Sequence, residues 1–236
     1  MFIVSIIGPD GVGKTTIVQR LRESLPLPVK YVYMGDNPAS FNYVLPTMRW
    51  WKKLSGAGRN GAPTGPPAAG ESSGLVHRPA ARPWRNPLRA VRKSVGFVNR
   101  MLDIWYRYAV AAYFARRGYV VLLDRHFVFD YYHFDIAPQN GRRPFKRRLQ
   151  GFLFKHTIPE PDLVICLDAP AEVIFARKGE FDVAYLERRR QQYRSLESVA
   201  RHFALVNADQ ELERVVQDVR DVICNFQKEK EAHVEV

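Results

Sequence analysis

The sequence contains few cysteines and no long apolar run. Its 236 residues include two cysteines, Cys166 and Cys224, without the close spacing typical of metal sites or disulfide frameworks. No uninterrupted apolar run reaches the roughly 18 residues that a membrane-spanning helix needs. Residues 1–7 lack the basic start and the small-residue cleavage site of a signal peptide. We therefore expect a cytoplasmic protein whose cysteines are ordinary core or surface residues.

Acidic residues are also scarce. The chain has 24 of them and 36 lysines and arginines, which gives a formal net charge of +12. The excess is concentrated: residues 52–107 hold eleven basic residues against Glu71 and Asp103, which accounts for nine of the twelve charges. Clustered basic residues attract polyanions, so nucleic acid and anionic membranes both enter as interpretations. The length and the 46% apolar content predict one domain over residues 1–236.

Apolar strand-like runs alternate with segments of helical spacing along the chain. The predicted strands are 2–7, 29–34, 120–123, 163–167 and 203–206, and the predicted helices are 14–25, 88–118, 149–156, 171–176, 183–202 and 211–227. This alternation predicts an α/β fold of three layers, with a parallel sheet covered by helices on both faces. Residues 55–87 have too few apolar residues to fold by themselves, and we expect them to be a flexible insertion rich in Gly, Pro and Arg.

Residues 8–15 read GPDGVGKT and fit the pattern of a phosphate-binding P-loop. The segment lies between a predicted strand and a predicted helix, which is the context that this motif requires. Backbone N–H groups of such a loop converge on the β-phosphate of a nucleotide, the lysine bridges the β- and γ-phosphates, and the threonine is a Mg²⁺ ligand. The residues predicted to bind the phosphates of ATP are Gly8, Gly11, Val12, Gly13, Lys14, Thr15 and Thr16.

Together with three further segments, the P-loop resembles the thymidylate kinase family of P-loop nucleoside-monophosphate kinases. These segments are GYVVLLDRH at 118–126, PDLVICLD at 161–168, and RKGE at 177–180 with the residues that lead to Tyr193. The resemblance implies a P-loop kinase fold with a five-stranded parallel sheet in the order 2-3-1-4-5. It also implies a basic helical LID around 177–190 that closes over the nucleotide phosphates.

The same resemblance implies the roles of the site residues. Lys14 and Asp124 would be catalytic, with Asp124 either organising Mg²⁺ together with Thr15 or accepting a proton from the acceptor. Arg177 or Lys178, from the LID, would stabilise charge on the transferred phosphoryl group. The residues implied to bind the acceptor are Asp10, Asp36, Arg107 and Arg125, and those implied to pack around the adenine are Asn207, Ala208 and Asp209.

Two other charged features have simpler interpretations. Asp168 ends a predicted strand, and we expect it to cap the helix after Pro170 and not to bind the metal. The run Arg188, Arg189 and Arg190 is expected to form a solvated helix face, as charge runs usually do.

The acceptor segment departs from the family. Residues 34–40 read MGDNPAS where relatives that phosphorylate thymidylate carry Arg-Glu-Pro-Gly-Gly. The favoured hypothesis is transfer of the ATP γ-phosphoryl group to a nucleoside monophosphate, and a sugar, glycan or other non-nucleotide hydroxyl acceptor stays open as the alternative. A homodimer also stays open.

A third hypothesis belongs to a different functional class, an ATP-binding protein associated with a membrane or with nucleic acid. The predicted helix 88–114 is basic and amphipathic, so it suits an anionic membrane surface with Trp105 and Tyr106 near the headgroups. The favoured interpretation is instead that its apolar face packs on the sheet while its basic face lies in water.

Overall fold

The computed structural model describes residues 1–35, 42–45, 47, 87–137, 144–179 and 181–232. Of the sequence-based predictions, the insertion up to residue 86 and the acceptor residue Asp36 lie outside these ranges. In the described part of the chain, no helix combines the length and the apolar character needed to cross a membrane. Both cysteines are free thiols, Cys166 in the core and Cys224 half-buried, as expected.

Five parallel strands form one sheet, as the alternating pattern predicts. The strands are β1 (Ile3–Ile7), β2 (Val29–Tyr33), β3 (Val120–Asp124), β4 (Leu163–Asp168) and β5 (Phe203–Asn207). Their order is β2-β3-β1-β4-β5, so the predicted order 2-3-1-4-5 is confirmed. The chain places β2 and β3 on one side of β1, and β4 and β5 on the other side. In open parallel sheets, ligands bind at the carboxyl ends of the strands where the strand order changes direction in this way.

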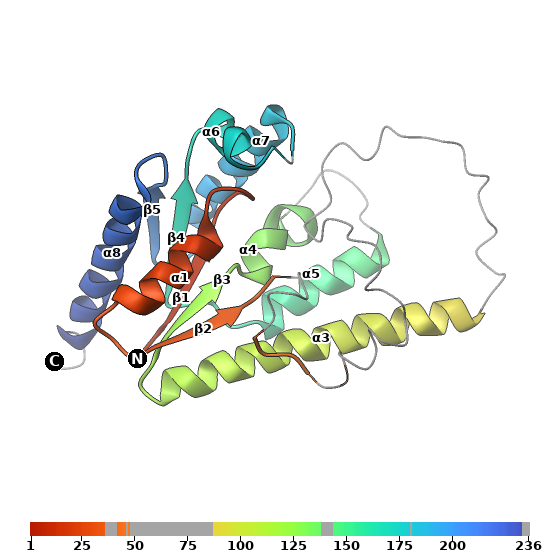
Figure 1. Cartoon of the computed structure of the whole chain (residues 1–236). Coiled ribbons are helices and arrows are strands. Elements are labelled where there is room, and N and C mark those ends of the chain that lie inside the picture. Colours follow the sequence, from red (N-terminus) through yellow and green to blue (C-terminus); the bar gives the residue numbers. More distant parts are fainter. Residues whose placement is uncertain (36–41, 46, 48–86, 138–143, 180, 233–236) are drawn as a thin grey trace.

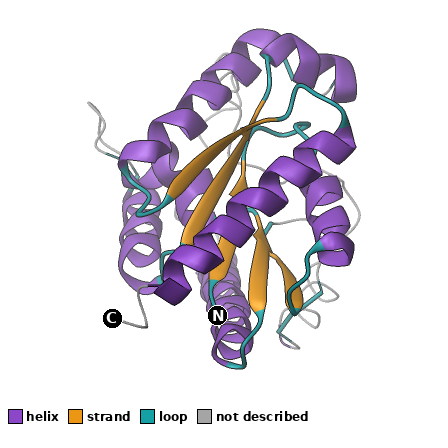
Figure 2. Ribbon diagram, turned by 90° about the vertical axis from the view of Figure 1, so that its left-hand side faces the viewer, coloured by secondary structure: helices purple, strands orange, loops and turns teal. Residues whose placement is uncertain are grey.

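Helices cover both faces of the sheet (Figure 1). On one face α1 (Lys14–Ser24) and α8 (Leu212–Ala232) pack against a core that includes Val4 and Ile6 of β1. On the other face α3 (Pro87–Arg116) and α5 (Phe145–Thr157) pack against Val121 and Leu123 of β3. Figure 2 shows the twisted sheet enclosed between these helical layers. The three-layer arrangement predicted from the sequence is therefore present.

The remaining helical segments gather near the carboxyl ends of the strands. They are α4 (Phe127–Tyr131) with a π-helical turn (Tyr132–Ile136), α6 (Ala171–Lys178), and α7 (Val183–Arg194) with a 3₁₀ turn (Ser195–Ser198). The helix predicted at 183–202 thus ends eight residues early, because the backbone tightens into the 3₁₀ turn where Leu196 enters the core.

No helix was predicted at 127–136, where aromatic residues give no clear period. Phe127 and Tyr131 nevertheless pack into the same core as α3 and α5. The turn also fits closely against Gly151 of α5, because a Cβ at that glycine would lie 2.0 Å from the carbonyl oxygen of Asp135. Tertiary packing therefore stabilises a helical segment that local pattern does not indicate.

Candidate active site

The loop between β1 and α1 depends on its glycines. Gly8, Gly11 and Gly13 have φ angles of 144°, 95° and 101°, which residues other than glycine rarely adopt. A Cβ at Gly8 would also lie 2.5 Å from the carbonyl oxygen of Leu167 at the end of β4. The loop can therefore follow this path only with glycine at these positions, and it delivers Lys14 to the first turn of α1.

Lys14 is buried inside the loop that precedes it. Its ammonium nitrogen donates hydrogen bonds of 2.7 Å to the carbonyl oxygens of Gly8 and of Pro9, and lies 3.7 Å from Asp10 Oδ1. Burial, and then the charge of Arg125, lower the pKa of Lys14 to about 8, although the carboxylate of Asp10 acts in the opposite direction. At neutral pH the loop therefore encloses a cation, held by carbonyl oxygens that an anionic ligand can replace.

Asp124 lies at the carboxyl end of β3 and is fully buried. Its Oδ2 accepts hydrogen bonds from the hydroxyl groups of Thr15 at 2.7 Å and Tyr31 at 3.3 Å. Among the described residues, its Oδ1 has no hydrogen-bond partner although it is shielded from solvent. A buried carboxylate oxygen without a partner is costly, and a bound cation or a water molecule would satisfy it.

The pair Thr15 and Asp124 fits a magnesium ion in its chemistry. Hydroxyl and carboxylate oxygens are hard ligands, and Mg²⁺ typically uses one or two such protein groups together with phosphate oxygens and water. Within the described ranges, no group of three or more His, Cys, Asp and Glu side chains is placed to hold a metal by itself. The protein groups would therefore hold the ion only in part, with a phosphorylated ligand completing the coordination.

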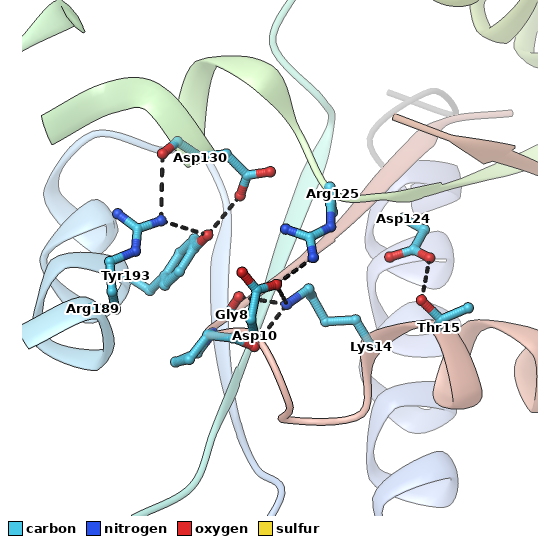
Figure 3. Close-up of polar contacts among 10 residues, drawn as sticks. Gly8, Asp10, Lys14, Thr15, Asp124, Arg125, Asp130, Arg189 and Tyr193 are labelled. Atoms are coloured by element: carbon cyan, nitrogen blue, oxygen red, sulfur yellow. Dashed lines mark hydrogen bonds and ion pairs between the residues drawn. The ribbon is translucent and has the colours of Figure 1, made fainter. Parts of the chain in front are cut away.

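Arg125 follows Asp124 with a left-handed backbone, φ 78°, which is rare for a residue other than glycine. Its N–H group still donates to the carbonyl oxygen of Ile6 at 3.1 Å, so the strand pairing is kept while the chain turns. The guanidinium then reaches Asp10 in the P-loop, to which it donates a hydrogen bond (Figure 3). Conformations of this kind are concentrated at functional sites, and this one directs a cation toward the loop of residues 8–15.

Asp10 carries a negative charge in this setting. Burial by itself raises its pKa, but the charges of Lys14 and Arg125 and the hydrogen bond from Arg125 outweigh burial and hold the pKa below its ordinary value. Asp10, Lys14 and Arg125, which the sequence assigned to one site, are thus brought together by the fold. Their charges are coupled, so an anion that binds Lys14 or Arg125 must compete with the Asp10 carboxylate.

A second polar cluster lies beside this one and joins α4 to α7. Tyr193 donates to Asp130 Oδ1 at 2.7 Å, and Arg189 donates to the Tyr193 hydroxyl at 2.9 Å and to the backbone oxygen of Asp130 at 3.4 Å. All three side chains are buried. Burial raises the pKa of Asp130, and the charges of Arg125, Lys14 and Arg189 limit that increase. Figure 3 shows the Asp130 carboxylate and Arg125 facing the space between the two clusters.

The interpretation of residues 188–190 as a solvated face is therefore wrong for Arg189. Arg188 is exposed, whereas Arg189 points inward with only 6% of its surface accessible. The buried residues of α7 are Leu186, Arg189 and Tyr193, a spacing of three and four residues that marks one helix face. That spacing is the signal by which the sequence could have identified Arg189.

The capping role predicted for Asp168 is also wrong. The residue preceding α6 is Pro170, and the helix has no side-chain cap. Instead, the two carboxylate oxygens of Asp168 accept hydrogen bonds from Arg190 Nε at 2.7 Å and Nη2 at 3.0 Å. A planar guanidinium matches a carboxylate in geometry, so this pairing through two hydrogen bonds connects the end of β4 to α7.

The predicted LID residues Arg177 and Lys178 are exposed in the last turn of α6. A Cβ at Gly11 would lie 3.3 Å from the Cβ of Lys178, so the backbone of the P-loop passes directly beside this turn. The fold thus brings the basic end of α6 next to the loop of residues 8–15. Gly179, with a φ of 65°, ends the helix there.

Arg107, predicted to bind the acceptor, is buried against the carboxyl end of β2. Its guanidinium donates to the carbonyl oxygens of Tyr33 at 3.2 Å and Gly35 at 3.0 Å, and to Asp103 Oδ2 at 2.7 Å. A Cβ at Gly35 would lie 3.0 Å from the Cδ atom of Arg125, which places Gly35 between the two arginines. In the described structure Arg107 supports the floor of the site, while Arg125 carries the contact with the P-loop.

The predicted adenine region follows β5. Asp209 donates its N–H to Asn207 Oδ1 at 2.9 Å, which forms a turn, and Ala208 donates its N–H to the carbonyl oxygen of Asp168 at 2.7 Å. These residues therefore lie at the same carboxyl edge of the sheet as the P-loop, on the side of β4 and β5.

The chain was also compared with known proteins. No protein-family model matches it, and no match is found among the curated proteins.

Proposed function

We propose that this protein is an ATP-dependent phosphotransferase of the thymidylate kinase type, with a P-loop kinase fold. One observation carries the proposal: buried Lys14 occupies the centre of a glycine-dependent loop, while the adjacent Thr15 hydroxyl is bonded to the strand-end carboxylate of Asp124. This combination supplies a cation for phosphate oxygens and hard oxygen ligands for magnesium at one place.

The donor site follows from the P-loop. The N–H groups of the loop and the first turn of α1 would point toward the β-phosphate, where the partial positive charge of the helix end favours an anion. Lys14 would exchange the carbonyl oxygens of Gly8 and Pro9 for β- and γ-phosphate oxygens. Thr15 and Asp124 would hold Mg²⁺, which when bound neutralises charge on those phosphates. Asn207, Ala208 and Asp209 lie at the same edge and would border the adenine.

In the transfer step, an acceptor oxygen forms a bond to the γ-phosphorus while the bond from that phosphorus to the bridging oxygen breaks. The electron pair of the broken bond stays on the leaving ADP. Charge spreads over the phosphoryl oxygens in the transition state, and Lys14 stabilises it because the ammonium is already in place. Arg177 or Lys178, at the end of α6 beside Gly11, would add a second cation when the LID closes.

The favoured acceptor is a nucleoside monophosphate. Arg125 is directed into the site by its left-handed backbone, and its planar fork suits a phosphate monoester. The buried guanidinium of Arg189 donates a hydrogen bond to the backbone oxygen of Asp130, and its charge makes the electrostatic potential of the same region more positive. In this interpretation the acceptor phosphate replaces the Asp10 carboxylate on Arg125, which frees Asp10 to accept a hydrogen bond from a ribose hydroxyl.

A non-nucleotide hydroxyl acceptor, such as a sugar, is a second candidate. It is favoured by the existing ion pair between Arg125 and Asp10, which leaves less net positive charge for an anionic acceptor. The buried carboxylate of Asp130 adds another hydrogen-bond acceptor suited to hydroxyl groups. In this case the proton of the attacking hydroxyl must pass to a carboxylate, and Asp124 is the residue assigned to that role.

Steady-state measurement of ADP formation with a panel of nucleoside monophosphates and a panel of sugars tests both candidates. We expect at least one acceptor to be phosphorylated, in a reaction that requires Mg²⁺ and that the Lys14→Ala variant does not catalyse. Direct titration with a non-hydrolysable ATP analogue separates binding from transfer. If the protein neither binds the analogue nor forms ADP with any acceptor, the proposed function is wrong.

A further inference from the structure

Asp124 differs from the carboxylate at the end of the neighbouring strand in the groups that bond to it. At the end of β4, Asp168 is paired through two hydrogen bonds with the guanidinium of Arg190. In the part of the chain that the structure describes, the hydrogen-bond donors of Asp124 are instead two neutral hydroxyl groups, those of Thr15 and Tyr31. An arginine offsets the charge of its partner, whereas a hydroxyl group leaves that charge in place. The negative charge of Asp124 therefore stays available to a cation.

Tyr31 reaches Asp124 because both side chains lie on the same face of the sheet. β2 and β3 pair in parallel with Tyr33 opposite Asp124, and side chains alternate between the two faces along a strand. Tyr31, two residues before Tyr33, therefore projects on the face of Asp124, which α1 covers. The ring of Tyr31 packs against the core on this face, and its hydroxyl donates to Asp124 Oδ2 at 3.3 Å. Thr15, in the first turn of α1, donates to the same oxygen at 2.7 Å.

The Tyr31 hydroxyl is a donor in this contact. Burial, and then the charge of Asp124 and the hydrogen bond to it, raise the pKa of Tyr31 above its ordinary value. The hydroxyl therefore keeps its proton at neutral pH and donates it to the carboxylate. A distance of 3.3 Å is long for a hydrogen bond between two oxygens, and contacts of this kind at active sites often shorten once the ligand is bound.

The two hydroxyl groups leave one oxygen of Asp124 for a ligand. A carboxylate oxygen accepts about two hydrogen bonds, so Thr15 and Tyr31 together fill Oδ2. Oδ1 is shielded from solvent and has no partner among the described residues. Figure 3 shows this oxygen turned away from Thr15 toward the side of Lys14, on whose ammonium the charge of Asp124 acts. A cation, or a water molecule bound to it, can thus approach the carboxylate only at Oδ1.

We propose that Tyr31 is a positioning residue for Asp124: its hydroxyl fixes the carboxylate through Oδ2, so that Oδ1 faces a magnesium ion or one of the water molecules around it. With Thr15 as the only donor, the carboxylate could rotate about its single remaining hydrogen bond, and the metal would be bound more weakly. This inference rests on the proposed function, because that function assigns magnesium to Asp124. The hydrogen bond itself can be measured without a nucleotide.

Calorimetric titration of the full chain with a non-hydrolysable ATP analogue, with and without Mg²⁺, tests the role of Tyr31. The ratio of the Kd without Mg²⁺ to the Kd with Mg²⁺ measures how much the metal strengthens binding. In Tyr31→Phe this ratio should fall by about threefold to tenfold, while the Kd without Mg²⁺ stays within about twofold of the wild-type value. The Mg²⁺ concentration for half-maximal ADP formation should rise by the same factor, and saturating Mg²⁺ should restore most of the kcat.

Tyr119→Phe is the matched control. Tyr119 is half-buried like Tyr31, but its ring packs on Phe114 directly before β3, at the end of that strand opposite to Asp124. Loss of its hydroxyl should leave both Kd values as in the wild type. A double-mutant cycle of Tyr31→Phe and Asp124→Asn, followed by urea denaturation without nucleotide, measures the hydrogen bond itself. The effects of the two substitutions on the free energy of unfolding should be non-additive, and thermal melting checks that each variant is folded.

Three results would overturn the role of Tyr31. If Mg²⁺ strengthens binding of the analogue equally in the wild type and in Tyr31→Phe, the hydroxyl does not position the carboxylate, although the proposed function stands. If the two substitutions of the cycle have additive effects on stability, the hydroxyl and the carboxylate are not coupled. If the wild type binds the analogue neither with nor without Mg²⁺, the proposed function and the role of Tyr31 are both wrong.

Discussion

The Thr15 hydroxyl donates a 2.7 Å hydrogen bond to Asp124 Oδ2, across 109 residues of sequence. The bond connects the first turn of α1 to the carboxyl end of β3, so two segments that each supply one side-chain oxygen meet at one point. Because Asp124 is fully buried, its charge acts in a medium of low dielectric constant and is felt strongly by any ligand in the loop. This relationship is the basis of the predictions about the donor site.

Lys14→Ala should abolish phosphoryl transfer and leave the protein folded. The substitution removes the cation that the loop encloses, and with it the compensation for charge developing on the phosphates. We expect kcat to fall by more than tenfold, which corresponds to at least about 1.4 kcal/mol of lost transition-state stabilisation. Steady-state kinetics and thermal melting measure the two effects. A variant that keeps more than about a tenth of the wild-type kcat would contradict the role of Lys14.

Asp124→Asn should lower kcat far more than it weakens ATP binding. The amide keeps the shape of the side chain but removes the charge that organises magnesium or accepts a proton. Asp168→Asn is the matched control, since it neutralises a carboxylate at the end of the neighbouring strand, where Arg190 is the partner. The control should mainly affect stability. Comparable losses of kcat in both variants would show that the metal carboxylate has been assigned to the wrong strand.

Arg125→Lys should distinguish the two acceptor classes. If Arg125 binds an anionic acceptor, loss of the planar fork raises the KM for that acceptor by about tenfold or more and leaves ATP binding unchanged. A neutral sugar gives the guanidinium no anion to hold, so its KM should hardly change. The measurement is a steady-state comparison of wild type and variant with each active acceptor. If only thermal stability falls, Arg125 and Asp10 form a structural ion pair and the acceptor site lies elsewhere.

Asp130→Asn should change the pH dependence of stability as well as the acceptor KM. Burial raises the folded-state pKa of Asp130 above its ordinary value of 3.8, so the folded protein loses stability as this group ionises. The cost is absent below pH 3.8, increases as the pH rises from 3.8 to the folded-state pKa because the unfolded chain ionises there while the folded protein does not, and stays constant at higher pH. The variant should therefore gain in free energy of unfolding relative to the wild type between pH 4 and pH 7. Urea denaturation at both pH values tests this, and a difference that does not change with pH would contradict it.

Lys14→Met should show the opposite trend at alkaline pH. The pKa of Lys14 falls from 10.5 to about 8 in the folded protein, so protonation opposes folding below pH 8. This cost, on the order of 3 kcal/mol, is lost as the pH rises from 8 to 10.5. The free energy of unfolding of the variant relative to the wild type should therefore decrease over that range. A relative stability that stays constant from pH 7 to pH 10 would show that the ammonium is not desolvated.

Asp130 and Arg189 are two candidate site residues that were not predicted from the sequence. Asp130 belongs to a helical segment whose aromatic residues have no clear period, and Arg189 belongs to a run of three arginines that is usually solvated. Each becomes a candidate site residue only because α4 and α7 pack against each other through Tyr193. A charge run by itself does not indicate which of its members faces inward; for Arg189 only the spacing to the apolar residue Leu186 and to Tyr193 on the same helix does.

The sequence alone determined the features that depend on neighbouring residues. Apolar runs predict the strands because a buried strand needs apolar side chains on both faces, and the consecutive residues 8–15 predict the P-loop because its turns need glycine locally. Only the tertiary structure decided which distant polar side chains bond directly to each other: Arg125 with Asp10, Asp168 with Arg190, and Thr15 with Asp124. Such pairs form across tens of residues, and their geometry follows from strand register and helix packing, which no local pattern contains.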